Sequence, residues 1–302
     1  MREKYGIIKE KFGADCLFSA PASGFTTYRA GGPVDALVKP SSRETLAWLS
    51  AFCLENDIPF LVLGAGSNIL VSDKGFKGVV ALTLKLDKIE LSGGTLTVEA
   101  GALWDNAAGI SAEAGLSGLE KTSGIPGTAG GAVFMNAGAF GQETFDCLES
   151  FEAMNRAGAV KIFKKSDVKY GYRKVEGLEG LTILSAMFRL KAGDKKTLAA
   201  ERRGVLARRA EKQPLDFPSA GSVFKRPPGD YASRLIDAAG LKGLRIGDAQ
   251  VSEKHAGFII NRGKASASDI YALIEKIRYE VKTRSGVELE LEQILLGEFN
   301  RT

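Results

Sequence analysis

Histidine is almost absent from this sequence, and its scarcity excludes several classes of catalytic site. The 302 residues contain one histidine, His255. One imidazole is too few for a multi-histidine zinc site, and it allows at most one Ser-His-Asp arrangement. Hydrolase chemistry is therefore disfavoured. His255 itself, in "EKHAGFIIN", is interpreted as a packed or solvated side chain without a catalytic role.

Cysteine is also scarce, and long apolar runs are missing. Cys16, Cys53 and Cys147 are odd in number and lie outside any CxxC pair, which argues against a disulfide framework and a thiolate metal site. We interpret them as buried thiols. No apolar stretch approaches the roughly 20 residues of a membrane span, and the N-terminus has no stretch of signal-peptide type. A cytoplasmic protein without a membrane partner is expected.

The charge balance is mildly basic and leaves the kind of partner open. The net charge is +5 at pH 7, and 44% hydrophobic residues allow a large core and two or three domains. A basic excess is typical of proteins that bind nucleic acid or a small polyanion. Nucleic acid is disfavoured because the basic residues of "TLAAERRGVLARRAEKQP" are not interleaved with aromatic side chains. The same basic residues also fit a solvated helix face.

Local patterns predict alternating helices and strands together with a hairpin. Ser41 and Glu44 form a capping-box pattern before a helical run, and "PFLVLG" follows as a buried strand. Gly93 and Gly94 separate two alternating stretches and indicate a tight hairpin. Helical spacing marks three further segments, "LWDNAAGISAEAGL", "TLAAERRGVLARRAEKQP" and "ASDIYALIEKIRYEVKTRSG". Gly286 is placed to end the last of them, and "VELELEQILLG" is then expected as a strand.

Three glycine-rich stretches are the main candidates for a ligand site. In "LGAGSNILVSDKGF", residues 64–68 follow a strand, and small residues there would let backbone N–H groups approach a phosphate. A dinucleotide-binding Rossmann turn is disfavoured because Ile69 stands where a third glycine or alanine belongs, and the following residues look extended. The stretch fits an ordinary tight turn about equally well.

The other two stretches strengthen the ligand interpretation. "SGIPGTAGGAVFMNAGAFG" combines six glycines with Ser123, Thr128 and Asn136. We interpret it as backbone that lies against a flat or pyrophosphate-bearing ligand, although a crowded hairpin would also require glycine. "TTYRAGGPVD" places Arg29 near Gly31. A P-loop NTPase is disfavoured because no Walker lysine follows any of the three stretches.

Six motifs in a fixed order give the sequence a resemblance to a known family. It resembles the UDP-N-acetylenolpyruvoylglucosamine reductases of bacterial cell-wall synthesis through "TTYRAGGP", "LGAGSNILVSDKGFKGVV", "GIPGTAGGAVFMNAGAFG", "YGYR", "AGSVFK" and "ELEQILLG". These motifs extend across nearly the whole chain. The resemblance implies an FAD-dependent oxidoreductase that uses NADPH to reduce UDP-N-acetylglucosamine enolpyruvate to UDP-N-acetylmuramate, a step in peptidoglycan precursor synthesis.

The resemblance also implies an α+β fold. It consists of a two-subdomain FAD-binding domain of the vanillyl-alcohol-oxidase type and a smaller α+β substrate domain. We assign residues 1–81 and 82–205 to the two FAD subdomains and residues 206–290 to the substrate domain. The C-terminal strand, residues 291–302, is expected to pack back on the second subdomain.

Three residues match the family's catalytic positions. Arg173, in "YGYRK", would use its planar charged fork to stabilise the enolate that hydride delivery creates. Ser222, in "AGSVFK", would donate a proton to the α-carbon, a task that needs no histidine. Glu292, five residues before Gly297, would assist Arg173 or Ser222. Without the resemblance, the three would be interpreted as a surface arginine, a turn serine and a solvated strand glutamate.

Further residues are assigned to binding through the same motifs. The FAD contacts are expected at Arg29, Gly31, Gly64, Ala65, Gly66, Ser67, Asn68, Ser123, Gly124, Ile125, Pro126, Gly127, Thr128, Gly130, Gly131, Asn136, Ala137 and Gly138. The substrate contacts are expected at Tyr172, Lys225, Arg208 and Lys212, of which the last two could instead address phosphates of NADPH. Lys225 would also stabilise the alkoxide of Ser222. No metal site is expected.

The chain resembles the shorter class of the family. Only fourteen residues separate Arg173 from "FRL", too few for an inserted loop that carries a pyrophosphate-binding tyrosine. Two alternative functions stay open. One is another FAD oxidase or dehydrogenase of the same fold, and the other is a nucleotide-sugar binding protein without redox activity. The sequence contains no signal for an oligomeric state.

Overall fold

The computed structural model describes residues 2–299 and divides them between two units with separate hydrophobic cores. Unit 1 contains the chain up to Phe18 together with Ala36–Ala65 and Gly78–Arg209. Unit 2 contains Ser19–Asp35, Gly66–Lys77 and the chain from Ala210 onward. The predicted substrate range therefore shares its unit with two earlier segments. Unit 1 has two cores, as two subdomains would, but the boundary predicted at residue 82 stays a prediction.

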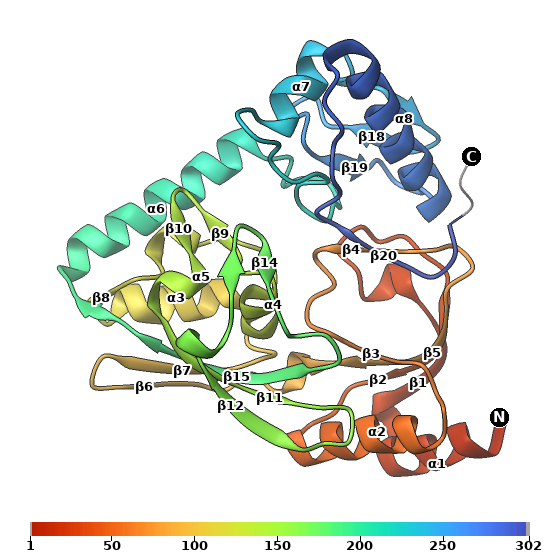
Figure 1. The fold of residues 1–302 in the computed structure, drawn as a ribbon, viewed down its shortest axis with the longest axis vertical. Helices are drawn as coiled ribbons and strands as arrows, with labels where there is room; N and C mark the ends of the chain where they lie inside the picture. Colours follow the sequence, from red (N-terminus) through yellow and green to blue (C-terminus); the bar gives the residue numbers. More distant parts are fainter. Residues whose placement is uncertain (1, 300–302) are drawn as a thin grey trace. The chain divides into compact units, whose positions relative to one another are not determined.

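The first layer of unit 1 is a four-stranded sheet covered by two helices. The strand order is β1 (Cys16–Pro21), β2 (Pro33–Val38), β5 (Phe76–Leu82) and β3 (Phe60–Leu63). The helices α1 (Arg2–Phe12) and α2 (Arg43–Glu55) lie against it (Figure 1). Their apolar side chains, including Ile8, Leu46 and Leu49, share one core with Val79 of the sheet. The predicted helix followed by a strand is confirmed.

The start of α2 differs by one residue from the predicted capping box. Ser42, not Ser41, is the N-cap: its Oγ accepts a hydrogen bond from the Thr45 N–H at 3.2 Å. Thr45 Oγ1 in turn accepts the Ser42 N–H at 3.1 Å, which closes the box. Two serines in a row offer two frames for the same pattern, and reciprocal bonding by Thr45 selects the second frame.

The second layer of unit 1 is a five-stranded antiparallel sheet. Its order is β12 (Val160–Lys164), β11 (Leu148–Met154), β15 (Thr182–Arg189), β7 (Thr95–Glu99) and β6 (Ile89–Ser92). The predicted hairpin at Gly93 and Gly94 joins β6 to β7, and both glycines have a positive φ. On one face lie α3 (Trp104–Glu113), α4 (Ala129–Phe134) and α5 (Thr144–Cys147), as Figure 1 shows.

Shorter elements complete unit 1. The two-stranded pairs are β8 (Leu116–Ser117) with β16 (Lys191–Ala192), β9 (Gly138–Ala139) with β10 (Gln142–Glu143), and β13 (Tyr170–Gly171) with β14 (Lys174–Val175). Single 3₁₀ turns occur in this unit at Gly13–Asp15, Thr83–Lys85, Glu120–Thr122 and Lys165–Asp167, while the turn at Ala22–Gly24 belongs to unit 2. The predicted basic helix is α6 (Lys195–Lys212), which buries Leu198, Val205 and Arg209.

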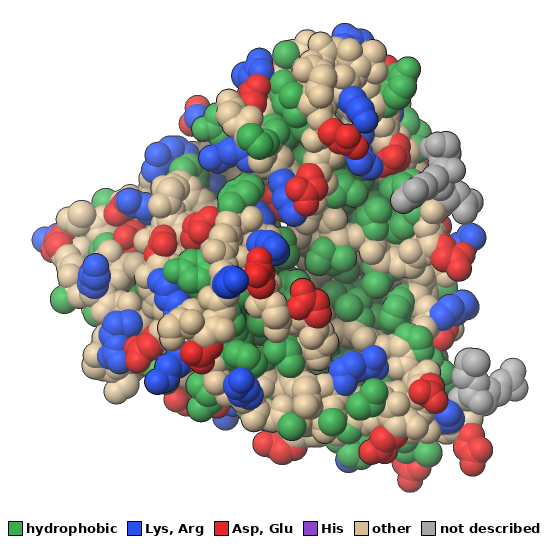
Figure 2. All heavy atoms as spheres, in the orientation of Figure 1, with side chains coloured by type: hydrophobic (Ala, Val, Ile, Leu, Met, Phe, Trp, Pro, Cys, Tyr) green, Lys and Arg blue, Asp and Glu red, His purple; other side chains and the backbone are tan. Residues whose placement is uncertain are grey.

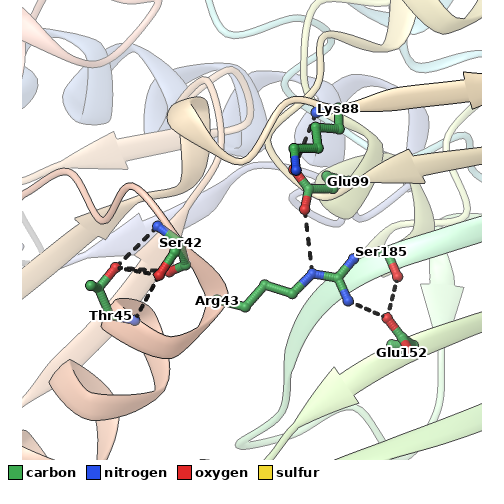
Figure 3. Close-up of polar contacts among 7 residues, drawn as sticks. All are labelled: Ser42, Arg43, Thr45, Lys88, Glu99, Glu152 and Ser185. Carbon is green, nitrogen blue, oxygen red and sulfur yellow. Dashed lines mark hydrogen bonds and ion pairs between the residues drawn. The ribbon is translucent and has the colours of Figure 1, made fainter.

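An arginine on α2 connects the two layers of unit 1 (Figure 3). Arg43 Nη1 lies 2.5 Å from Glu152 Oε2 on β11, and Arg43 Nε lies 3.4 Å from Glu99 Oε1 on β7. Ser185 of β15 donates its hydroxyl to the same Glu152 oxygen at 2.6 Å. The Lys88 N–H donates to Glu99 at 3.2 Å. One guanidinium therefore holds carboxylates from two strands of the second sheet to the helix of the first.

Unit 2 combines a small antiparallel sheet with two helices and a parallel strand pair. The sheet order is β17 (Arg245–Ile246), β18 (Ala249–Val251) and β19 (Ile259–Asn261). The helices are α7 (Ala232–Ala238) and α8 (Ala267–Ser285), and Gly286 ends α8 in the left-handed conformation, as predicted. The parallel pair joins β4 (Ile69–Val71) to β20 (Ile294–Leu296). Tyr28 lies in the same core as side chains of both helices.

The C-terminal segment departs from the predicted continuous strand. Residues 287–297 form one isolated bridge, between Leu291 and Phe224, followed by the short strand β20. The segment changes partner along its length, because Glu290 and Glu292 pair with residues 223–225 while β20 pairs with β4. The prediction places the C-terminal strand on the second FAD subdomain. The structure instead pairs it with β4, which lies in the range assigned to the first subdomain. Residues 300–302 of that predicted strand lie outside the described residues.

Two further features concern the charged side chains at the surface and the length of apolar helices. Figure 2 shows Lys and Arg interspersed with Asp and Glu over the face that it draws. Among residues 2–299, the helices are all too short or too polar to cross a lipid bilayer.

Candidate functional site

The glycine-rich segment 123–138 of unit 1 contacts the first glycine-rich turn at Gly64. Thr128 is the N-cap of α4, and its Oγ1 accepts the Gly131 N–H at 3.5 Å. A Cβ at Gly64 would lie 2.1 Å from Thr128 Oγ1. Because no side chain fits there, glycine at this position lets β3 end directly against Thr128. The structure thus brings together two predicted cofactor-binding stretches, within one unit.

Close packing also explains other glycines of this segment. A Cβ at Gly130 would lie 2.8 Å from Ala100 Cβ, and one at Gly138 would lie 2.6 Å from Gln142 O. The Gly130 N–H donates to Ala100 O at 2.9 Å, so this N–H group is used in a hydrogen bond within the protein. At Gly130 and Gly138, close packing of the surrounding atoms is therefore sufficient to explain why the residue is glycine. A contact between them and FAD stays a prediction, as it does for Ala65, Ile125, Pro126, Gly127, Gly131 and Ala137.

Two buried polar side chains in this segment have different environments. Asn136 is fully buried and hydrogen-bonded: its Nδ2 donates to Glu143 at 2.8 Å and to Gly171 O at 3.1 Å, and its Oδ1 accepts the Phe145 N–H. Ser123 is also fully buried, but its Oγ has no hydrogen-bond partner. A buried hydroxyl without a partner is costly. An unsatisfied hydroxyl fits a segment that binds a polar group such as those of FAD, and a contact between Ser123 and FAD stays a prediction.

Arg173 stands at the tip of the β13–β14 hairpin, next to the same segment. It has a φ of 55°, which is uncommon for a residue with a side chain and typical of functional sites. Its Nη2 donates to Gly138 O at 2.7 Å, and its guanidinium lies 5.0 Å from the ring centre of Tyr172. The hairpin and Gly138 thus fix the position of the predicted enolate-stabilising charge.

Arg209 was missed by sequence reasoning, although Arg208 was chosen. Arg208 is exposed and lies over the ring of Phe140 at 4.8 Å. Arg209 is 6% exposed and packs on Gly124, where a Cβ would lie 2.8 Å from Arg209 Cδ. Burial lowers the pKa of Arg209, Asp105 raises it and nearby Arg173 lowers it. Two arginines that repel each other beside a glycine-rich segment are typical of an anion-binding region.

A helical pattern in the sequence could have identified Arg209. Leu198, Val205 and Arg209 are the buried residues of α6, and their spacing of seven and four follows one helix face. Arg202 shares this face, and its Nη2 donates to Asp105 Oδ2 at 2.7 Å. Asp105 Oδ1 also accepts the Gly124 N–H at 2.7 Å. This face of α6 thus places Arg209 against Gly124 and Arg202 against Asp105, which itself binds the Gly124 N–H.

In unit 2, Ser222 and Glu292 lie on neighbouring stretches of one short ladder. The Glu292 N–H donates to Val223 O at 2.9 Å, and the Lys225 N–H donates to Glu290 O at 2.8 Å. On its other side, the segment pairs through a bridge between Ser222 and Phe258. Ser222 is half-buried. The backbone segments that carry the two predicted catalytic residues of this unit therefore lie side by side, although they are far apart in the sequence.

Lys225 has an ion-pair partner in this ladder. Its Nζ contacts Glu290 Oε1, the carboxylate two residues before Glu292. Lys212, the last residue of α6, is exposed in the same unit. Tyr172 and Arg208 belong to unit 1, so the predicted substrate-binding residues are divided between the units.

Asn68, a predicted FAD residue of unit 2, is hydrogen-bonded to the segment that carries Glu292. Asn68 Nδ2 donates to Glu292 O at 3.1 Å, and Asn68 O accepts the Ile294 N–H at 3.0 Å. Gly66 O accepts the Thr27 N–H at 3.2 Å, which links this turn to the "TTYRAGGP" motif. The remaining predicted residues here are Arg29, Gly31 and Ser67. Asn68 thus holds the backbone of Glu292 in place, and this role does not depend on a contact between Asn68 and FAD.

His255 is a packed side chain. Its Nδ1 accepts the Gly257 N–H at 3.1 Å, and its ring meets Phe258 edge-on at 4.9 Å between centres. Burial lowers the pKa of His255. These contacts agree with the interpretation of a packed histidine.

Comparison with known proteins covers both parts of the chain. Residues 34–164 match an FAD binding domain, and residues 213–296 match the C-terminal domain of UDP-N-acetylenolpyruvoylglucosamine reductase. A glucose oxidase variant of Phl p 4 shares the fold alone, with 15% identity and a TM-score of 0.51 over 64% of this chain and 44% of that chain. The predicted fold class, α+β with an FAD-binding domain of the vanillyl-alcohol-oxidase type, is confirmed.

The relatives of higher identity are reductases that match this chain over nearly their whole length. UDP-N-acetylenolpyruvoylglucosamine reductase of Clostridium beijerinckii is 45% identical over 97% of this chain and 99% of its own. That of Caldanaerobacter subterraneus is 44% identical over 97% of this chain and 96% of its own. The Thermus caldophilus reductase structure has 36% identity and a TM-score of 0.80, covering 92% of this chain and 98% of that chain. The chain therefore belongs to the UDP-N-acetylenolpyruvoylglucosamine reductase family.

Proposed function

We propose that this protein reduces UDP-N-acetylglucosamine enolpyruvate to UDP-N-acetylmuramate with NADPH, in the synthesis of peptidoglycan precursors. Membership of the family and the match to an FAD binding domain support this reaction. The glycine-rich stretches around Gly64 and Ser123 would hold FAD, which would supply the means of hydride transfer from NADPH to the enolpyruvyl double bond. A cytoplasmic location and the absence of a nucleic-acid partner belong to the same proposal.

Arg173 stabilises the negative charge that hydride delivery creates. Hydride addition to an enol ether conjugated to a carboxylate pushes an electron pair from the α-carbon into the carboxylate oxygens. A permanently charged guanidinium can offer two N–H groups to those oxygens. Gly138 O and the hairpin tip already hold Arg173, so little reorganisation is needed at the moment of reaction. Buried Arg209 adds positive charge to the same region.

Ser222 supplies the proton that completes the reduction. The enolate carbon is a stronger base than a serine alkoxide stabilised by nearby positive charge, so the hydroxyl can act as the general acid without a histidine. Lys225 provides that charge in the proposal, and Glu292 assists Ser222 or Arg173. The observation that carries this assignment is the ladder that pairs residues 223–225 with residues 290–292.

Binding is divided among the motif residues. We propose that FAD contacts the glycine-rich stretches around Gly64, Ser123 and Arg29. The UDP-sugar contacts Tyr172 and Lys225, while Arg208 and Lys212 address phosphate groups of the UDP-sugar or of NADPH. The short connection between β14 and β15, residues 176–181, supports an assignment to the shorter class of the family.

Ser222→Ala separates the two half-reactions. We expect the variant to be reduced by NADPH at nearly the normal rate, because no proton from Ser222 is needed in that step. Reoxidation of the flavin by substrate should slow by about 10²-fold to 10⁴-fold, the usual worth of a general acid. Anaerobic rapid mixing, with flavin absorbance as the signal, measures both steps.

Ser219→Ala is the matched control, because it removes a hydroxyl from the same segment. It should leave both half-reactions within about threefold of the unaltered protein. Equal losses in both half-reactions of Ser222→Ala would contradict the proton-donor role. Reduced flavin that only oxygen reoxidises would favour an oxidase, and a colourless protein that binds UDP-N-acetylglucosamine without taking up FAD would favour a binding protein.

A further inference from the structure

A buried glutamine holds the backbone just before Ser222. Gln293 is 4% exposed, and its Nε2 donates to Ala220 O at 3.0 Å and to Gly221 O at 3.5 Å. Its Oε1 accepts the hydroxyl of Tyr28, itself fully buried, at 3.1 Å. We propose that Gln293 is a positioning residue for proton donation, acting on Ser222 through the carbonyls of Ala220 and Gly221. This inference rests on the proposed function of Ser222.

The register of the short ladder places Gln293 opposite Ser222. Phe224 bridges Leu291, and the Glu292 N–H donates to Val223 O, so the next pair along the ladder is Ser222 with Gln293. Residues directly opposite in an antiparallel pair have side chains on the same face. The Gln293 amide therefore reaches the chain where the regular backbone pairing ends.

Ser222 is held from both sides by different means. On its C-terminal side, the Val223 N–H donates to Gly257 O at 2.9 Å. On its N-terminal side, Gly221 adopts a φ of 72°, a left-handed conformation that glycine reaches without steric cost. The side chain of Gln293 fixes the two carbonyls of that turn. Loss of these bonds should let the hydroxyl shift relative to the α-carbon that it protonates.

The hydrogen bonds of Gln293 allow only one orientation of its amide. The NH₂ group must face the two carbonyls, because an amide oxygen there would repel both of them. Burial raises the pKa of the Tyr28 hydroxyl well above its usual range, so Tyr28 stays protonated and donates to Oε1. The Tyr28 backbone is tied in turn to Asn261, whose Nδ2 donates to Tyr28 O at 3.0 Å. The network is therefore rigid, as a positioning device requires.

Gln293→Met tests the proposal in the FAD-loaded protein. The substitution keeps the volume and removes both donors. We expect reduction by NADPH to stay within about twofold, and reoxidation by substrate to slow by about 10-fold to 100-fold, as small misplacements of reacting groups do. The solvent deuterium isotope effect on reoxidation should increase, because proton transfer becomes more rate-limiting.

Gln250→Met is the matched control. Gln250 is 6% exposed in the same unit and also donates to a carbonyl, Gly243 O, at 3.1 Å. Its loss should destabilise the protein to a similar degree without changing the ratio of the two half-reactions. If Gln250→Met and Gln293→Met slow reoxidation equally, or if both half-reactions of Gln293→Met slow equally, the role of Gln293 is merely structural and the proposal is overturned.

Gln293→Glu decides the question even if the methionine variant folds poorly. A protonated carboxyl group can donate to one carbonyl, whereas a carboxylate repels both, and burial raises the pKa of a glutamate. Reoxidation of this variant should therefore become about tenfold faster from about pH 8 to about pH 6, beyond any change in the unaltered protein. An unchanged pH profile would overturn the proposal. Failure of substrate to reoxidise the unaltered protein would instead refute the proposed function itself.

Discussion

Burial controls the reactivity of the three cysteines. Cys16 and Cys53 are fully buried, and Cys147 is partly buried. Burial raises the pKa of Cys16, and it raises the pKa of Cys53 and of Cys147 to about 12, with Asp146 contributing at Cys147. Because only the thiolate reacts, on the order of one in ten thousand of the latter two thiols is reactive at about pH 8.

The native protein should therefore resist thiol reagents. At about pH 8, we expect modification by Ellman's reagent to be at least about 100-fold slower in the native protein than in denaturant, where all three thiols should react. Absorbance of the released thiolate follows the reaction. One thiol that reacts quickly and completely in the native state would contradict the buried-thiol interpretation.

At the level of elements, Arg43 links α2 to two strands of the second sheet of unit 1 through its ion pairs with Glu99 and Glu152. Its side chain is 34% exposed, and Glu99 is 16% exposed. Arg43→Met should lower the free energy of unfolding by about 1 to 3 kcal/mol, because it leaves two carboxylates without their cation. Urea denaturation measures the change.

Arg189→Met provides the comparison for an exposed pair. Arg189 lies 2.9 Å from Glu149, and the two side chains are 60% and 43% exposed. Its loss should cost less than about 1 kcal/mol, as for other surface ion pairs. If the two substitutions cost the same, Arg43 does not act as a link between the layers.

The effect of Arg43→Met should depend on pH. Hydrogen bonds from Ser185 and Arg43, in that order, lower the pKa of Glu152 below its ordinary value of 4.5. A group with a lowered pKa stabilises the folded state above its unfolded pKa and loses this contribution as the pH falls through the folded value. The difference between the unaltered protein and Arg43→Met should thus be full at neutral pH and shrink below pH 4.5. A penalty that stays constant to lower pH would contradict this account.

At the scale of the whole molecule, FAD should stabilise the folded protein. A ligand that binds only the native state adds about 2.7 kcal/mol when present at 100 times its dissociation constant. We expect FAD added to the apoprotein to raise the thermal midpoint by roughly 5 to 10 °C. Differential scanning fluorimetry with FAD, FMN and no flavin measures it.

Substitutions at glycine test where this stabilisation arises. Gly64→Ala should weaken the effect of FAD, because its Cβ would lie 2.1 Å from Thr128 Oγ1 and displace the segment that we assign to FAD. Gly204→Ala, in α6, meets nothing within 4 Å and should leave the effect unchanged. An equal shift with FMN would contradict the assignment of FAD as the cofactor.

Local patterns in the sequence predict several turns and helix ends correctly, and the order of the motifs predicts the family. The Gly93–Gly94 hairpin, the end of α8 at Gly286 and the helix followed by β3 depend on neighbouring residues, and each is confirmed. Motif order also predicted the FAD-binding fold and Ser222, Arg173 and Glu292 as candidates. Such features can be predicted because turn geometry, capping and helical spacing are set over a few residues.

The hydrogen bonds that hold the candidate site together depend on the tertiary structure. Tyr28 and Gln293, 265 positions apart, meet in one hydrogen bond, and Asn68 and Glu292, 224 positions apart, meet in another. Helical spacing places Arg209 on the buried face of α6, but the tertiary structure sets which segment packs there, at Gly124. Local sequence has no signal for such contacts, because they depend on which distant segments fill the same core. The motifs thus named the chemical groups, while packing fixed which of them support one another.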